Sequence, residues 1–293
     1  MKKNEFVALA HQVSPTGFLD YRQWLDALYK LLKNSVASYS YSRFAADLGF
    51  SSSNVLHHVI KGRRPLTTAA CLKIAGTLRL GNLETSYLKY LVAYNNSDNE
   101  IERHDTLQML LDLQHRLVDD TAGRHRLEFF KKWYHPVIAE LARLENFSSD
   151  PGWISRCLNQ MVTEQEVAES LQLLERMGLI EWNAEKGTHQ RTKADPSTGA
   201  QVTEISVASY HAQMIKKAGE ALVRCDKVER IFHALTLVAD ESTLGKIETL
   251  LLDLQKQVVA IDATVKKPQQ VFQLNVQFFP LSRSLKKAVE RAS

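Results

Sequence analysis

The residues best suited to chemistry in this sequence are a group of small polar side chains and imidazoles that is followed directly by cations. Hydroxyl, amide and imidazole groups can hydrogen-bond to the base edges of a duplex. Three cations beside one helix end are what phosphate contacts require. We therefore predict that double-stranded DNA is bound by the following residues: Arg43, Ser51, Ser52, Ser53, Asn54, His57, His58, Lys61, Arg63 and Arg64.

The apolar residues around this group predict the helices that position it. A short helix over 42–48 should end at Gly49, because a glycine readily adopts the left-handed backbone that ends a helix. A second helix is expected over Ser52–Ile60, with Ser51 as its N-cap. Pro65 then ends the basic loop and a third helix follows. The buried face of the second helix would be made by Val55, Leu56, Val59 and Ile60.

This order of elements is typical of a helix-turn-helix, which places its second helix in the major groove. Residues 40–80 resemble the phage-repressor and Cro class of that motif. They depart from its pattern by about one residue between Ser51 and Gly62. Either Val55 or Leu56 is therefore the main buried anchor of the recognition helix.

Five segments of the chain extend the resemblance to nearly its full length: FLDYRQWLDALYK, YSRFAADLGFSSSNVLHHVIKGRR, FFKKWYHPVIAEL, VAESLQLLERMGLI and VFQLNVQFFPLSR. In these segments the chain is similar to a family of uncharacterised bacterial proteins that is expanded in predatory and fibre-degrading bacteria. In that family an N-terminal helix-turn-helix precedes a C-terminal domain of unknown function. The resemblance implies a transcriptional regulator, with no known ligand and no catalytic residues.

Composition sets limits on the class of protein. The net charge is +4 over 293 residues, but residues 40–80 carry six cations against one acid. A local basic patch fits a nucleic-acid partner, although a solvated helix surface would give the same charge. The three widely spaced cysteines suit a reducing cytoplasm and predict neither a disulfide nor a zinc site. No apolar run approaches the ~20 residues of a membrane span.

The sequence lacks the motifs of common enzymes and nucleotide-binding proteins. It contains no phosphate-binding loop of the Walker type, no GxGxxG, no HExxH and no GxSxG. We therefore expect no catalytic residues, no metal and no cofactor, and a cytoplasmic protein without a membrane contact.

The predicted fold class is α+β, predominantly α-helical. We expect an N-terminal helical helix-turn-helix domain over 1–95, with residues 1–17 poorly ordered, and a polar break at Asn95–Asn99. A connecting helix over 96–123 would lead to a C-terminal domain over 124–293. A winged-helix-like segment over 150–195 should begin that domain.

The winged-helix prediction rests on a helix that runs from Thr163 to Met177, with Thr163 and Glu166 as a capping box, followed by a hairpin. The helix carries four glutamates and one arginine, and this net charge of −3 would repel phosphate. A packing or dimerisation role is therefore favoured. Four cationic or imidazole residues of the wing argue the other way: Lys186, His189, Arg191 and Lys193.

The last third of the chain reads as strand, helix, strand. Residues 232–238 and 271–279 alternate in polarity, and a long apolar helix from Asp240 to about Val265 lies between them. We predict a parallel βαβ unit over 230–280.

Taken together, these patterns predict a DNA-binding transcriptional regulator that acts as a homodimer. Its C-terminal domain would dimerise and sense a signal. The sequence leaves open whether that signal is an unidentified small-molecule ligand. Two alternatives do not involve DNA: a protein-interaction module, and a receptor for a small second messenger.

Overall fold

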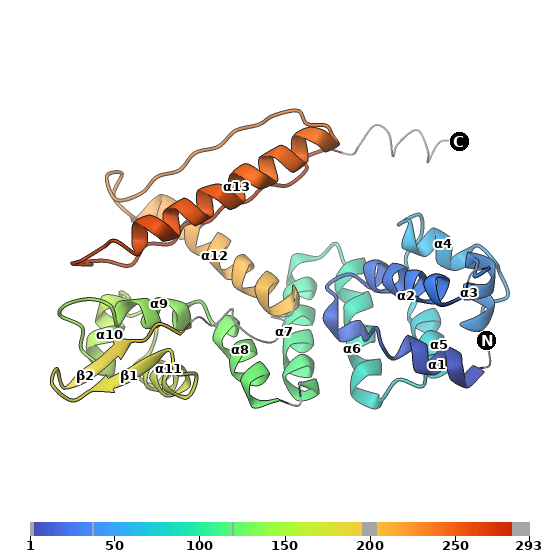
Figure 1. The fold of residues 1–293 in the computed structure, drawn as a ribbon, viewed down its shortest axis with the longest axis horizontal. Coiled ribbons are helices and arrows are strands. Elements are labelled where there is room, and N and C mark those ends of the chain that lie inside the picture. Colours follow the sequence, from blue (N-terminus) through green and yellow to red (C-terminus); the bar gives the residue numbers. More distant parts are fainter. Residues whose placement is uncertain (1–2, 37, 119, 195–203, 283–293) are drawn as a thin grey trace. The chain divides into compact units, whose positions relative to one another are not determined.

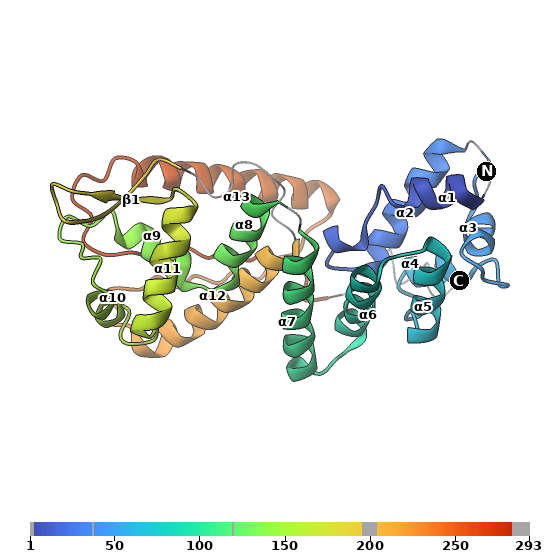
Figure 2. The same ribbon diagram turned by 90° about the horizontal axis from the view of Figure 1, so that it is seen from below.

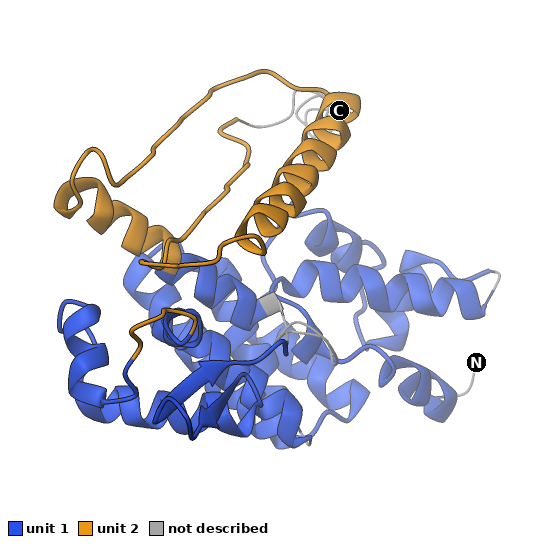
Figure 3. Cartoon of the chain, turned by 60° about the vertical axis from the view of Figure 1, so that its left-hand side comes forward, with its two compact units in different colours: residues 1–142, 148–213 blue, residues 143–147, 214–293 orange. Residues whose placement is uncertain are grey.

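The computed structural model describes residues 3–36, 38–118, 120–194 and 204–282. Helices dominate it (Figure 1), which confirms the predominantly α-helical α+β class. The strands of the described residues form one two-stranded sheet. The chain divides into two compact units (Figure 3). Unit 1 comprises Met1–Ala142 and Ser148–Gln213, and unit 2 comprises Arg143–Phe147 and Met214–Ser293.

The first half of unit 1 is a helical bundle around one apolar core. Its central helix is α2, whose side chains at Tyr21, Trp24 and Leu25 are fully buried. Asp20 caps this helix by accepting a hydrogen bond from the backbone N–H of Arg22 at 2.8 Å. The elements are α1 (Lys3–Ala10), a 3₁₀ turn (Pro15–Gly17), α2 (Tyr21–Ser35), α3 (Tyr41–Asp47), α4 (Val55–Ile60), α5 (Thr68–Leu78), α6 (Asn82–Asn96) and α7 (Glu100–Leu117).

The prediction that residues 1–17 are poorly ordered is wrong for the described residues. Helix α1 buries Phe6, Val7 and Ala10 against the bundle. Trp24 donates its indole N–H to the carbonyl of Val13 at 2.9 Å, which fixes the segment after the helix. An isolated helix of eight residues is only marginally stable in water, so contacts with the bundle stabilise α1.

Helices α6 and α7 lie side by side (Figure 2). Leu107, Leu110 and Leu111 of α7 are buried in the core of the bundle. Gln114 donates its side-chain amide to the carbonyl of Thr16 at 3.0 Å. The helix predicted as a connection is therefore packed on the N-terminal helical bundle along much of its length.

The second half of unit 1 contains the predicted winged-helix order. Thr163 and Glu166 form the predicted capping box of α11, and the hairpin that follows pairs Ile180 with Arg191 and Trp182 with His189. The elements are α8 (Thr121–Lys131), α9 (Tyr134–Leu141), α10 (Pro151–Cys157), α11 (Glu164–Arg176), β1 (Ile180–Asn183) and β2 (Thr188–Arg191). Helix α12 (Glu204–Arg224) continues from unit 1 into unit 2.

Unit 2 corrects the prediction of a βαβ unit over 230–280. The central helix forms as α13 (Glu241–Asp262), but residues 232–238 and 271–279 form no strand. Alternating polarity suits a strand, yet a strand exists only when its backbone pairs with a neighbour. Within the described residues neither segment has a sheet partner.

Candidate nucleic-acid interface

A glycine turn separates α3 from α4. Ser40 caps α3 by accepting a hydrogen bond from the backbone N–H of Arg43 at 3.2 Å. Gly49 has φ of +84°, and its N–H donates to Ala46 at 2.9 Å while the N–H of Phe50 donates to Ala45 at 2.8 Å. This pair of bonds is the Schellman end of a helix, which needs the left-handed residue that the sequence predicted.

Helix α4 begins at Val55, three residues later than predicted, and Asn54 is its N-cap. Ser51 is therefore not the cap, and Ser52 and Ser53 lie in the turn. Serine side chains compete for backbone hydrogen bonds and favour turns over helix interiors.

Leu56 is the main anchor of this short helix. Its side chain is fully buried, while Val55 is only partly buried. Val59, one turn further along, is also buried. The opposite side of α4 is therefore the side turned to solvent.

Eight of the ten predicted DNA-binding residues are exposed, and His57 and His58 are half-buried. The structure brings His57 and His58 together, with ring centroids 5.9 Å apart. Lys61 and Arg63 lie close enough for their charges to act on His57. The two imidazoles and two of the cations thus form one local group at the end of α4.

The imidazole of His57 is held in place by an aromatic stack. Tyr41 stacks on Tyr29 with ring centroids 3.8 Å apart, and His57 lies 4.7 Å from Tyr41. Burial lowers the pKa of His57 below its usual value, and the charges of His58, Lys61 and Arg63 lower that pKa further. A neutral imidazole both donates and accepts hydrogen bonds, so His57 suits a base edge better than a phosphate.

Arg43 is directed toward its own helix. Its guanidinium lies 3.8 Å from the carboxylate of Asp47 and 5.8 Å from the ring centre of Tyr39. The Tyr39 hydroxyl also donates to Asp47 at 2.8 Å. The charge of Arg43 is therefore partly balanced by the carboxylate of Asp47.

The basic loop, residues 61–66, is fixed at both of its ends. At its start Gly62 has φ of +67°, and the N–H of Arg63 donates to the carbonyl of His58 at 2.8 Å. At its end the N–H of Leu66 donates to the hydroxyl of Tyr21 at 3.1 Å. Asn96 donates its amide to the carbonyl of Leu66 at 2.9 Å.

Tyr21 and Asn96 are positioning residues that sequence reasoning missed. Asn96 belongs to the stretch that was predicted as a polar break, but it is the last residue of α6. No spacing pattern connects it to Leu66, because 30 residues separate them. Lys73 of α5 was counted only as part of the local charge, yet its ammonium lies 5.3 Å from the ring centre of Phe50 in the turn.

The wing offers fewer free cations than its sequence suggests. Arg191 lies 3.3 Å from Glu140 and donates to the carbonyl of Leu179 at 3.0 Å. His189 shares a hydrogen bond of 2.8 Å with the hydroxyl of Ser149. Lys186 and Lys193 are exposed. The hairpin thus uses two of its four basic residues to hold its own structure.

Ser149, His189 and Glu175 have the residue types of a hydrolase triad, but their geometry indicates a brace. The Ser149 oxygen accepts the backbone N–H of His189 at 2.8 Å and bonds the Thr188 hydroxyl at 2.7 Å. The other imidazole nitrogen is 3.9 Å from Glu175. A nucleophilic oxygen needs a free lone pair and a base that accepts its proton, whereas this oxygen is already used by the hairpin.

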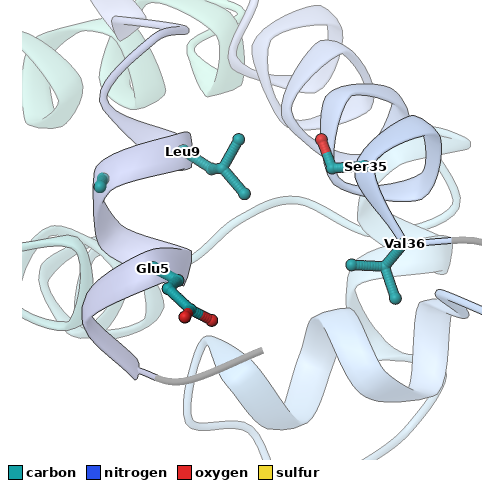
Figure 4. Close-up of a pocket in the computed structure, with 5 residues that line it drawn as sticks. Glu5, Leu9, Ser35 and Val36 are labelled. Atoms are coloured by element: carbon teal, nitrogen blue, oxygen red, sulfur yellow. The ribbon is translucent and has the colours of Figure 1, made fainter.

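An open pocket of about 440 Å³ lies between α1 and the end of α2 (Figure 4). Its lining is Glu5, Ala8, Leu9, Ser35 and Val36. One carboxylate among aliphatic groups gives no recognisable ligand site. No group of three or more metal-binding side chains occurs in the part of the chain that the structure describes. Among the described helices, none has both the length and the apolarity to cross a membrane.

Residues 114–281 match the family model described as a domain of unknown function (DUF4423). The match covers more than half of the 293 residues and begins within α7, after the basic loop. Comparison with curated proteins and with solved structures gives no match.

Proposed function

The chain belongs to the DUF4423 family of domains of unknown function, and we propose that it is a DNA-binding transcriptional regulator. The observation that carries the proposal is the basic loop. It is anchored at both ends, and it follows α4, whose N-terminal end is polar and exposed. We propose binding because the exposed cations of this loop offer a surface for a polyanion.

The proposed role of α4 is to enter the major groove. In helix-turn-helix proteins the N-terminal residues of the second helix contact base edges. Here that end carries Asn54, whose side chain makes no capping hydrogen bond, and His57 follows one turn later. Leu56 and Val59 hold the opposite side in the core.

The proposed role of the basic loop is to bind phosphate. Lys61, Arg63 and Arg64 are exposed there, and phosphate contacts fix the register of a protein on the duplex without reading sequence. Lys73 is a further candidate from α5. Because the Tyr21–Asn96 pair holds the end of the loop, its cations need little ordering on binding.

The rest of the proposal concerns the whole protein. We propose an N-terminal DNA-binding domain over 1–95 and a C-terminal part that dimerises and senses a signal in the cytoplasm. A two-fold dimer would match a palindromic operator. We also propose the finer family assignment, a helix-turn-helix regulator of the type expanded in predatory and fibre-degrading bacteria.

The experiment is a selection of genomic fragments by the purified full chain, followed by binding measurements over a range of salt. A true DNA-binding protein enriches a shared site, and its affinity falls steeply as salt rises because counterions are released. Enrichment of no site, together with weak binding that does not depend on salt, would reject the proposal and favour the protein-interaction alternative.

A further inference from the structure

Helix α13 carries a long apolar stripe, of which Ile247 and Leu251 are half-buried and no residue is fully buried. It runs for 22 residues without a buried residue. Its apolar residues recur at alternating steps of three and four, which is the a and d pattern of a coiled coil. The stripe consists of Leu244, Ile247, Leu251, Leu254, Val258 and Ile261. A helix of this kind gains its stability by packing the stripe against another element.

The two extended segments before and after α13 also lack a packing partner of the kind that their sequences predict. Residues 232–238 and 271–279 have the alternation of strands, and neither has a sheet partner among the described residues. In the second segment Phe272 and Phe278 are 70% and 45% exposed. An extended stretch outside any sheet, with exposed apolar side chains, is the kind of edge onto which another strand adds.

The apolar surface involved is large. Of the 29 large apolar side chains that are exposed in the described residues, 23 lie in unit 2. Summed over all sides of unit 2, these side chains expose on the order of 2,000 Å², and a soluble monomer rarely exposes a contiguous apolar patch larger than a few hundred Å². A standard stable interface needs about 800 Å² from each partner.

We propose that a second copy of this chain covers unit 2, with the α13 stripes packed against each other and the two extended segments paired with those of the partner. A stripe with apolar residues at every a and d position is complementary to itself across a two-fold axis. In a parallel pairing the flanking contacts would be Thr243 to Glu248, Leu250 to Gln255, and Gln257 to Asp262. None of these contacts joins two like charges, so self-association meets no electrostatic barrier there.

The inference names the dimerisation surface of the regulator proposed above, but the observations that carry it come from unit 2 alone. It is therefore tested by molecular mass and not by DNA binding. A dimer that does not bind DNA would reject the proposed DNA binding and leave this inference standing. A monomer that binds DNA would reject this inference and the proposed dimer, and would leave the proposed DNA binding standing.

The experiment compares the full chain with the double variant Leu251→Glu/Leu254→Glu by light scattering. A matched control, Thr249→Glu/Lys256→Gln, changes the net charge by the same amount on the outer face of α13. We expect the wild type and the control to have twice the chain mass and the stripe variant to have the mass of one chain. Since α13 buries no residue within one chain, the variant should keep the helical circular dichroism of unit 1.

Two further measurements guard against a variant that misfolds. The milder Leu254→Asn should raise the dimer dissociation constant at least tenfold without loss of helicity. Amide protons of residues 232–238 and 272–278 should exchange at least tenfold more slowly in the wild type than in the stripe variant, because strand pairing protects them. A monomeric wild type, a dimeric stripe variant, or fast exchange of these amides within a dimer would each overturn the proposal.

Discussion

The hydroxyl of Tyr21 donates a hydrogen bond of 2.9 Å to the side-chain oxygen of Asn96, across 75 residues of sequence. Both groups also bind the backbone of Leu66, which is 2% exposed. This contact fixes the end of the basic loop against the helical bundle. It connects the start of α2, the end of α6 and the loop that carries Arg63 and Arg64.

The first prediction concerns this contact. Tyr21→Phe removes the hydroxyl and leaves the Leu66 N–H and the Asn96 amide without that partner, which should cost about 1–3 kcal/mol of stability. Amide exchange in residues 61–66 should become faster, and DNA affinity should fall because the loop must be ordered on binding. Tyr90→Phe, at an exposed tyrosine of α6, is the control and should change neither property. Unchanged loop exchange in Tyr21→Phe would show that the loop does not depend on this contact.

The second prediction concerns the cations of the loop. Replacing Arg63 and Arg64 with alanine should weaken binding to cognate and random DNA alike and reduce the salt slope by about two contacts. Fluorescence anisotropy at several salt concentrations measures both effects. The control replaces Lys186 and Lys193, the exposed cations of the wing, and should leave the slope unchanged. A loop variant with the wild-type slope would mean that the loop does not face DNA.

The third prediction concerns base recognition at the start of α4. Asn54→Ala and His57→Ala should each cost about 1–3 kcal/mol on the cognate site and little on random DNA, because only base contacts depend on sequence. Asn34→Ala and His104→Ala, which change the same residue types at exposed positions of α2 and α7, are the controls. Equal losses of affinity for both DNAs would mean that these side chains contact the DNA phosphate backbone. No loss of affinity would mean that α4 does not enter the groove.

The fourth prediction concerns the buried His135 of α9, which shares a hydrogen bond of 2.8 Å with the Ser170 hydroxyl. Burial lowers the pKa of His135 to about 4, and the charge of Lys132 lowers it in the same direction. In the unfolded chain the pKa is about 6.5, so between these values the unfolded state binds more protons. The contribution of His135 to stability is therefore present above about pH 6.5 and is lost as the pH falls toward 4, by roughly 1.4 kcal/mol per pH unit.

Denaturant unfolding of the full chain between pH 7 and pH 4.5 measures this loss. His135→Gln should flatten the dependence on pH by about one proton, whatever its effect on stability at pH 7. His104→Gln, at an exposed position of α7, should keep the wild-type slope. An unchanged slope in His135→Gln would mean that other groups carry the acid sensitivity.

Local patterns in the sequence were sufficient for the elements whose structure depends on near neighbours. The end of α3 at Gly49, the capping box of Thr163 and Glu166, and the hairpin after α11 all form as predicted. Each of these elements depends on hydrogen bonds between residues a few positions apart. The residue types that make those bonds therefore predict the element. The polar and basic composition of residues 51–64 is likewise a property of the sequence itself.

Tertiary structure decided the features that depend on distant residues. Helix α1 forms because Phe6 and Val7 meet the bundle, and the basic loop is held by Tyr21 and Asn96, which no local pattern connects to it. The segment 271–279 has the alternating pattern of a strand but forms none. A strand needs a second stretch of backbone to pair with, and alternation in one segment does not supply that second stretch.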